Sequence, residues 1–144
     1  MGDLTKNFSK SEFECNDGSE MPQEVFDNVE VHAYNLQVIR DFCDASVIIN
    51  SAYRSPSYNK KVGGATKSQH LTGNASDITI KGYTPDEVAD IIEGLIRIDA
   101  IEEGGVGRYD TFTHYDRRGT KARWDNTELR TWKNIRGINV LRTR

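Results

Sequence analysis

Two histidines and one aspartate in this chain of 144 residues have the types and spacing suited to metal chemistry. His70 and Asp77 lie seven positions apart, and His114 follows in the segment 112–116. Two imidazoles and a carboxylate form the ligand set that a catalytic zinc uses when it keeps a fourth position for water. Because seven residues exceed one helical turn, a loop leading into a strand has to bring His70 and Asp77 to the same ion. We predict one Zn²⁺ per chain, held by His70, Asp77 and His114.

The elements that position these residues follow from hydrophobic periodicity and helix-start signals. Apolar residues at a helix-like period predict a helix from Pro22 to about Phe42, and it carries His32, for which we expect a structural or surface role. A capping box at 84–87, with proline at the first helical position, predicts a second helix to about Ile98. The remaining segments predict strands at 46–50 and 75–80, a short helix at 55–61, and a hairpin with arms at 106–109 and 111–116.

These elements predict an α+β fold, in which a small, mainly antiparallel sheet has helices packed on one face. In the strand 75–80, alternation places Asp77 and Thr79 on one side and Ile78 and Ile80 on the other. No repeat, low-complexity tract or linker divides the chain. We therefore expect a single domain over residues 1–144, with less regular ends at about 1–20 and 125–144.

The composition bears on partners and compartment. A net charge of −3 gives no basic footprint, so we expect no nucleic-acid partner. No apolar run is long enough to span a bilayer, and the first residues do not begin a signal peptide. Two cysteines, Cys15 and Cys43, neither form a zinc finger nor require an oxidising compartment, and we expect both to be reduced.

The segment around His70 resembles a family signature. Ser68, His70, Gly73, Ala75 and Asp77 match Ser-x-His-x-x-Gly-x-Ala-x-Asp at every fixed position, which is the signature of the M15 peptidases. This is the zinc D-Ala-D-Ala carboxypeptidase or VanX-like group, with a hedgehog-like zinc fold. Further similarity, from about residue 5 to about residue 125, lies in the blocks 7–13, 51–56, 104–107 and 123–124.

The resemblance also implies a substrate anchor. In the family, the arginine matching Arg54 and the serine matching Ser68 grip the carboxylate end of a short peptide, which suits the planar donor fork of guanidinium. The alternative for Arg54 is an ion pair with an acidic neighbour that holds its loop. Tyr53 and Tyr109 are candidates for lining the same cleft.

The general base is less well defined. Many family members carry Asp or Glu three positions before the third ligand, and this slot holds Thr111 here. Asp116 lies two residues after the third ligand on the same strand face, and Asp110 lies one residue before the usual slot. We assign the base role to Asp116 or Asp110, with a slight preference for Asp116. The alternative for Asp116 is a carboxylate that orients a ligand or pairs with Arg54 or Arg117.

By this resemblance, the leading prediction is a zinc metallopeptidase that acts on short peptides of bacterial peptidoglycan. It would be a D,D-carboxypeptidase or D,D-dipeptidase, or a stem-peptide endopeptidase. The missing signal peptide favours a phage-type lysin, made in the cytoplasm and acting at the bacterial cell wall after release. We expect a monomer. Its partner would be a peptidoglycan stem peptide or another D-Ala-D-Ala-type peptide. The rival is a catalytically silent hedgehog-like zinc-binding module, which the missing carboxylate before His114 keeps open.

Overall fold

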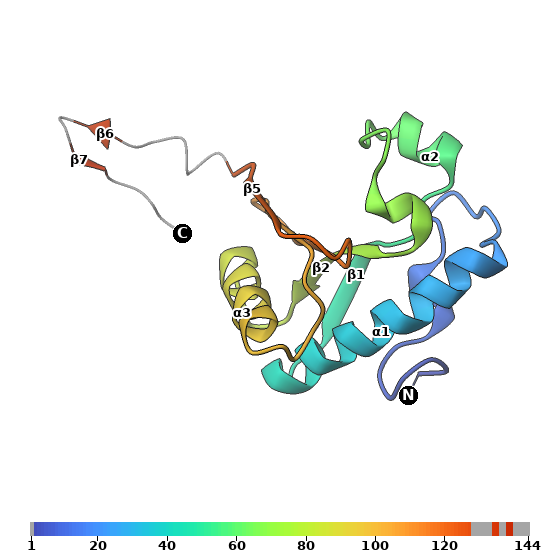
Figure 1. The fold of residues 1–144 in the computed structure, drawn as a ribbon, viewed down its shortest axis with the longest axis horizontal. Helices are drawn as coiled ribbons and strands as arrows, with labels where there is room; N and C mark the ends of the chain where they lie inside the picture. Colours follow the sequence, from blue (N-terminus) through green and yellow to red (C-terminus); the bar gives the residue numbers. More distant parts are fainter. Residues whose placement is uncertain (1, 128–133, 136–137, 140–144) are drawn as a thin grey trace.

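The computed structural model describes residues 2–127, 134–135 and 138–139. It has an α+β architecture, as the sequence predicted, with a five-stranded mixed sheet, two long helices and one short helix (Figure 1). In chain order the elements are the 3-10 helix η1 (Lys10–Phe13), α1 (Gln23–Cys43), β1 (Val47–Ser51), α2 (Pro56–Lys61), the 3-10 helix η2 (Gln69–Thr72), β2 (Ala75–Ile80), α3 (Pro85–Arg97), β3 (Gly105–Arg108), β4 (Thr113–Asp116), β5 (Ala122–Asp125), β6 (Asn134–Ile135) and β7 (Ile138–Asn139).

The sheet has the strand order β1-β2-β4-β3-β5. Its neighbours pair antiparallel except at the β3–β5 edge, where the pairing is parallel. The registers align one residue from each of four strands: Asp77 pairs with His114, His114 with Gly107, and Gly107 with Trp124. Because paired residues point to the same face of a sheet, these positions form one row across it. We call the face that carries this row the outer face.

The two long helices cover the opposite, inner face, while α2 stands apart from both (Figure 1). From α1, the His32 ring stacks on Tyr115 of β4, with ring centroids 5.5 Å apart, and meets Ser76 Oγ of β2 at 2.9 Å. From the start of α3, the Pro85 carbonyl accepts a hydrogen bond from the Thr113 hydroxyl at 2.7 Å. His32 is therefore a buried structural histidine, one of the two roles expected for it.

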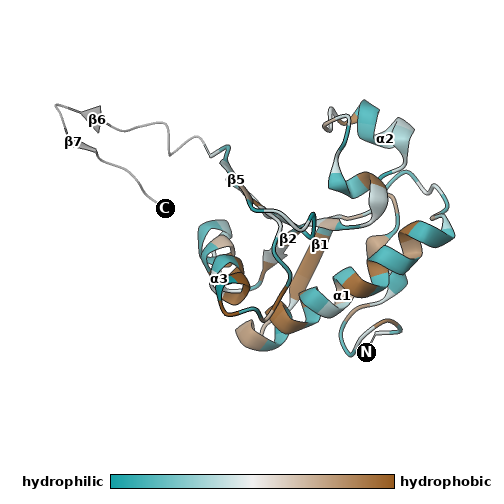
Figure 2. Ribbon diagram, in the orientation of Figure 1, coloured by the Kyte–Doolittle hydropathy of each residue, from teal (hydrophilic) through white to brown (hydrophobic). Residues whose placement is uncertain are grey.

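The core lies between these helices and the inner face. Residues with no exposed surface include Val29, Leu36 and Ile39 of α1, Ile92 of α3 and Ile78 of β2. Burying one such side chain completely stabilises the folded state by about 1.5–3 kcal/mol, so this layer supplies most of the driving force for folding. Figure 2 shows the pattern on α3, where hydrophobic and hydrophilic residues alternate between two sides of the helix.

The start of α3 shows why this helix begins where it does. The Thr84 hydroxyl accepts a hydrogen bond from the Glu87 amide at 3.1 Å, and the Glu87 carboxylate accepts one from the Thr84 amide at 2.8 Å. This is the predicted capping box, which satisfies two backbone donors that no helical partner can reach. Pro85 occupies the first helical position, where its missing N–H costs nothing.

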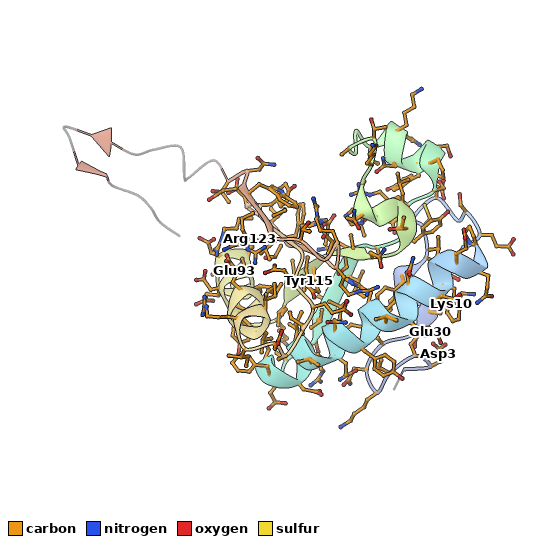
Figure 3. All side chains as sticks on the ribbon, in the orientation of Figure 1. Asp3, Lys10, Glu30, Glu93, Tyr115 and Arg123 are labelled. Carbon is orange, nitrogen blue, oxygen red and sulfur yellow. The ribbon has the colours of Figure 1, made fainter. Side chains whose placement is uncertain are left out.

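Charged side chains fasten the sheet edge to α3. Arg123 of β5 pairs with Glu93 at 3.2 Å, and the two residues lie side by side in Figure 3. Arg108 of β3 pairs with Asp86 and Asp90, each at 2.7 Å. The Arg123 contact ties β5, the edge strand of the sheet, to α3, and the Arg108 contacts tie its neighbour β3 to the same helix. The sequence predicted only partial order from Arg123 onwards and did not predict this strand; most of the segment 128–144 lies outside the described residues.

The other sequence predictions can be compared directly. The expected hairpin arm at 106–109 is β3, which begins one residue earlier, and the expected arm at 111–116 is the shorter strand β4. Phe8 and Phe13, in the N-terminal part expected to be less regular, are buried in the core. Cys15 and Cys43 are free and buried. In the part of the chain that the structure describes, no helix has the length and hydropathy needed to cross a membrane.

Candidate metal centre

The row on the outer face carries two of the three predicted ligands, Asp77 and His114, on adjacent strands. His70 of η2 completes the set, and one ligand atom from each residue lies within 4.8 Å of the other two. All three residues are buried, with exposed fractions of 2% for His70, 6% for Asp77 and 7% for His114. The structure therefore brings together the three residues that the sequence singled out.

The loop before β2 aims His70 at Asp77. Ser68 caps η2 by accepting a hydrogen bond from the His70 amide at 3.1 Å. Gly73 ends η2 with a φ of +80°, a left-handed conformation that glycine adopts without steric cost. The His70 Nδ1–H donates to the Ala52 carbonyl at 2.7 Å, because that oxygen can only accept. This bond turns Nε2 towards Asp77, whose Oδ1 lies 3.3 Å away.

The two oxygens of Asp77 have separate partners. Oδ1 faces both imidazoles, at 3.0 Å from His114 Nδ1 and 3.3 Å from His70 Nε2. Oδ2 accepts a hydrogen bond from Arg54 at 3.3 Å. Burial raises the pKa of Asp77, but hydrogen bonds from His114 and His70 outweigh burial and hold this pKa well below its usual range. Asp77 is therefore ionised at neutral pH, as a metal ligand has to be.

Both ring nitrogens of His114 face carboxylates. Nδ1 points to Asp77, and Nε2–H donates to Asp116 Oδ2 at 2.7 Å. Burial lowers the pKa of His114, but the hydrogen bonds with Asp116 and Asp77 outweigh it and raise this pKa above its usual value. Asp116 keeps the proton on Nε2, so Nδ1 is the nitrogen available to an ion. A carboxylate behind a ligating imidazole fixes both the tautomer and the ring orientation.

Asp116 is fully buried behind His114. Its carboxylate accepts bonds from Arg118 at 2.7 and 2.9 Å and from the Gly105 amide at 2.9 Å. Burial raises the pKa of Asp116, but the bonds from Arg118 and His114 hold it well below the usual range. This geometry is that of the alternative named for Asp116, an orienting carboxylate. Its arginine partner is Arg118, not Arg54 or Arg117 as the sequence suggested.

Arg117 points to the inner face instead. Its guanidinium donates to His32 Nδ1 at 3.3 Å and to the Asn28 carbonyl at 2.8 Å. Arg117 and Arg118 are consecutive, so alternation places them on opposite faces. Arg118 lies on the face of Asp116, and Arg117 lies on the inner face. The same alternation, applied one step beyond β4, would have indicated Arg118 rather than Arg117 as the partner of Asp116.

Close packing explains two glycines of the block 104–107. A Cβ on Gly105 would contact the Asp116 carboxylate, and one on Gly107 would contact the Trp124 indole. The Trp124 ring therefore packs against Gly107, and its centroid is 5.0 Å from that of His114. Any side chain at these two positions would displace groups that touch the third ligand.

A cleft of about 430 Å³ opens over the row. One wall is the loop 62–70 together with Arg54, and the other contains Tyr109, Phe112, Arg118 and Trp124. Arg54 and Ser68, the predicted substrate anchors, both line it, as do all three ligands. Arg54 also makes the ion pair with Asp77 that was its alternative role.

Two sequence-derived candidates lie elsewhere. Tyr53 was expected to line the cleft, but only 4% of it is exposed and it packs in the hydrophobic core. Asp110 is exposed on the turn between β3 and β4 and is not among the described residues that line the cleft. Among those lining residues, Asp77 is the only carboxylate, whereas Arg54, Lys67 and Arg118 are cationic. The cleft is thus electropositive even before an ion binds.

Comparison with known proteins bears on this geometry. Residues 6–116 match a family model described as Peptidase M15. The chain belongs to the peptidase M15 family. A comparison with curated proteins finds no match. The matched range contains the three predicted ligands, Arg54, Ser68, Asp110 and Asp116, and it ends before Arg118 and Trp124.

The M15 triad of this chain is suited to a divalent ion. Its donors are two imidazole nitrogens and one carboxylate oxygen, which together match a tetrahedral site with one open position. A second atom of each ligand forms a hydrogen bond to a supporting group. These bonds join His70 Nδ1 to Ala52, Asp77 Oδ2 to Arg54, and His114 Nε2 to Asp116. Such support is characteristic of metal ligands, since it fixes their direction before the ion arrives.

Proposed function

We propose that this protein is a zinc metallopeptidase that hydrolyses short peptides of bacterial peptidoglycan. The observation that carries the proposal is the buried His70, Asp77 and His114 cluster at the floor of an electropositive cleft. M15 peptidases are typically zinc-dependent, and the two-imidazole, one-carboxylate donor set suits zinc. When bound, the ion supplies Lewis acidity towards a peptide carbonyl and lowers the pKa of water.

The residues around the triad have separable roles in this proposal. Asp116 holds His114 in the tautomer that leaves Nδ1 free, and Ala52 does the same for Nε2 of His70. Arg54 neutralises Asp77 Oδ2 from the side of the cleft. Burial of the triad keeps competing water away and strengthens each of these interactions. The triad is thus preorganised, so little reorganisation is needed when substrate enters.

The chemistry of the walls indicates an anionic peptide. Arg54, Lys67 and Arg118 attract carboxylates, and Arg54 and Ser68 are placed to grip a terminal one. The volume of about 430 Å³ lies within the usual range for small-ligand sites and suits a short peptide rather than a folded protein. Peptidoglycan stem peptides, which end in a free carboxylate, meet these requirements. We therefore propose D,D-carboxypeptidase, D,D-dipeptidase or stem-peptide endopeptidase activity at the bacterial cell wall.

Digestion of purified peptidoglycan tests the proposal and identifies the bond. Zinc-loaded protein should release a discrete peptide or amino acid that mass spectrometry can assign. Protein treated with a chelator should release nothing until zinc is restored. The His70→Ala, His114→Ala double variant is the matched control, because it keeps the cleft walls and removes two ligands. Zinc-loaded protein that leaves the peptidoglycan intact would overturn the proposal.

One observation favours the second candidate, a zinc-binding module without peptidase activity. Among the described residues that line the cleft, no carboxylate other than the ligand Asp77 is present to accept a proton from water. Of the two carboxylates proposed as general base, Asp116 is buried behind His114 and Asp110 lies on the neighbouring exposed turn. A protein that binds one zinc and muropeptides but cleaves none of them would establish the module instead.

A further inference from the structure

The electropositive cleft contains a phenol with an unusual set of partners. The Tyr109 hydroxyl oxygen accepts a hydrogen bond from Trp124 Nε1 at 2.9 Å. Because a phenol has a single proton and indole N–H can only donate, this bond leaves the Tyr109 proton for another acceptor. Within the described part of the chain, no group accepts that proton. Tyr109 lines the same cleft as the three ligands.

The phenol is held in place from two sides. Its ring stacks on Phe112 across the β3–β4 turn, with centroids 4.3 Å apart and planes 13° from parallel. Trp124, which fixes the hydroxyl oxygen, is seated against Gly107 and lies 5.0 Å from the His114 ring, centroid to centroid. The hydroxyl is therefore tied through one indole to the third ligand. A donor fixed in this way needs no reorganisation when a substrate charge develops.

The other polar groups that line the cleft include the cations Arg54, Lys67 and Arg118 and the neutral donors Ser68 and Gln69. Arg54 is engaged with Asp77, Asn59 and Ser51. Arg118 is engaged with Asp116 through two of its nitrogens. Tyr109 differs from these cations because it is a neutral donor whose oxygen is held in place by the Trp124 indole.

We propose that the Tyr109 hydroxyl donates a hydrogen bond to the scissile carbonyl oxygen as negative charge develops there. The inference rests on the proposed function, since it assigns a catalytic residue to the same peptide hydrolysis. Attack by water turns the planar carbonyl into a tetrahedral oxyanion, and the phenol keeps its proton throughout. Trp124 acts as a positioning residue for Tyr109. The expected signature is loss of kcat with little change in KM, because the bond strengthens only in the transition state.

The test compares Tyr109→Phe with wild type on the soluble muropeptide that corresponds to the product released from peptidoglycan. Removing one oxyanion donor typically lowers kcat about 10²–10³-fold. We expect a loss of this order with KM within about twofold, unchanged zinc content and unchanged Tm. Trp124→Phe keeps an aromatic ring but removes the N–H, and should lower kcat less. Tyr34→Phe, on the exposed side of α1, is the matched control and should match wild type.

Each outcome decides something different. Full activity of Tyr109→Phe, beside an active wild type, overturns the inference and leaves the peptidase proposal standing. If Tyr109→Phe loses turnover together with zinc or thermal stability, the phenol has a structural role. If only KM rises, it has a binding role. Either result also overturns the inference. A wild type that cleaves neither peptidoglycan nor muropeptide overturns the proposed function, and the inference with it.

Discussion

Replacing Asp116 with asparagine separates an orienting carboxylate from a general base. Five N–H groups point at the Asp116 oxygens: one from His114, one from Gly105 and three from Arg118. An asparagine fits the same space but replaces one oxygen by an NH₂ group. Whichever way the amide turns, at least two donors then face another donor.

The size of the effect follows from which of these donors can recover. The Arg118 side chain is 32% exposed and can turn to water, whereas the ring of His114 is 9% exposed and cannot. One buried unsatisfied N–H costs about 1–3 kcal/mol, so the free energy of unfolding should fall by about that amount. The His114 ring also loses its fixed tautomer, and loss of such a partner lowers metal affinity about 10–100-fold.

The assay is competition for zinc between the protein and a chromophoric chelator, followed by turnover at saturating zinc. Asp116→Asn should bind zinc about 10–100-fold more weakly and recover much of its turnover once loaded. Asp110→Asn, on the exposed turn, is the control and should keep wild-type zinc affinity. The reasoning is refuted if Asp116→Asn keeps its zinc affinity and loses about 10²–10⁴ in kcat, which is the signature of a lost base.

Three further outcomes are expected. Arg54→Ala should lower kcat/KM for peptides with a free terminal carboxylate by a factor that corresponds to about 2–5 kcal/mol of lost transition-state binding, and equal losses on amidated peptides would show that Arg54 only holds the fold. Burial and the nearby Arg117 charge hold the pKa of His32 well below its usual value. In mildly acidic solution, therefore, the His32 ring is protonated in the unfolded chain but not in the folded one. Urea unfolding should therefore show stability falling below about pH 6.5, by at most about 1.4 kcal/mol per pH unit, and a His32→Gln variant should lose that contribution. Gly107→Ala should displace Trp124, lowering turnover while circular dichroism stays unchanged.

The sequence predicted those features that depend on local signals. The capping box at Thr84 and the alternation of Asp77 with Ile78 are set by residues close together in the chain, and both are confirmed. The three-ligand cluster was also predictable, because the motif fixes the type and order of its members. His70 needs only the turn that Gly73 allows to face Asp77.

Features that depend on pairing across the sheet could not be predicted in the same way. The strand β5 pairs parallel to β3, and no periodicity in the four residues from Ala122 indicates a partner so placed. The contacts of Asp116 depend on how the chain continues after β4, where Arg118 folds back onto the carboxylate, and on which nitrogen of the His114 ring faces it. The same-face rule placed Asp116 near His114 correctly but does not say which side of the ring it occupies.

Phe112 and Arg118 were absent from the candidate site for a related reason. Each lines the cleft because of a turn geometry, not because of a residue pattern. Tyr109 was considered only as a lining residue, since its bond to Trp124 spans two strands. The glycines of the block 104–107 were the one available indication of these contacts, because a glycine within a strand often marks the close approach of another group.

Zinc K-edge X-ray absorption of the loaded protein tests the central claim most directly. We expect one zinc per chain with two imidazole ligands at about 2.0–2.1 Å and an oxygen shell that includes one carboxylate. The His70→Ala, His114→Ala double variant should lose both the imidazole signal and stoichiometric zinc. A spectrum with sulfur ligands, or stoichiometric zinc retained by the double variant, would contradict the assignment of His70, Asp77 and His114.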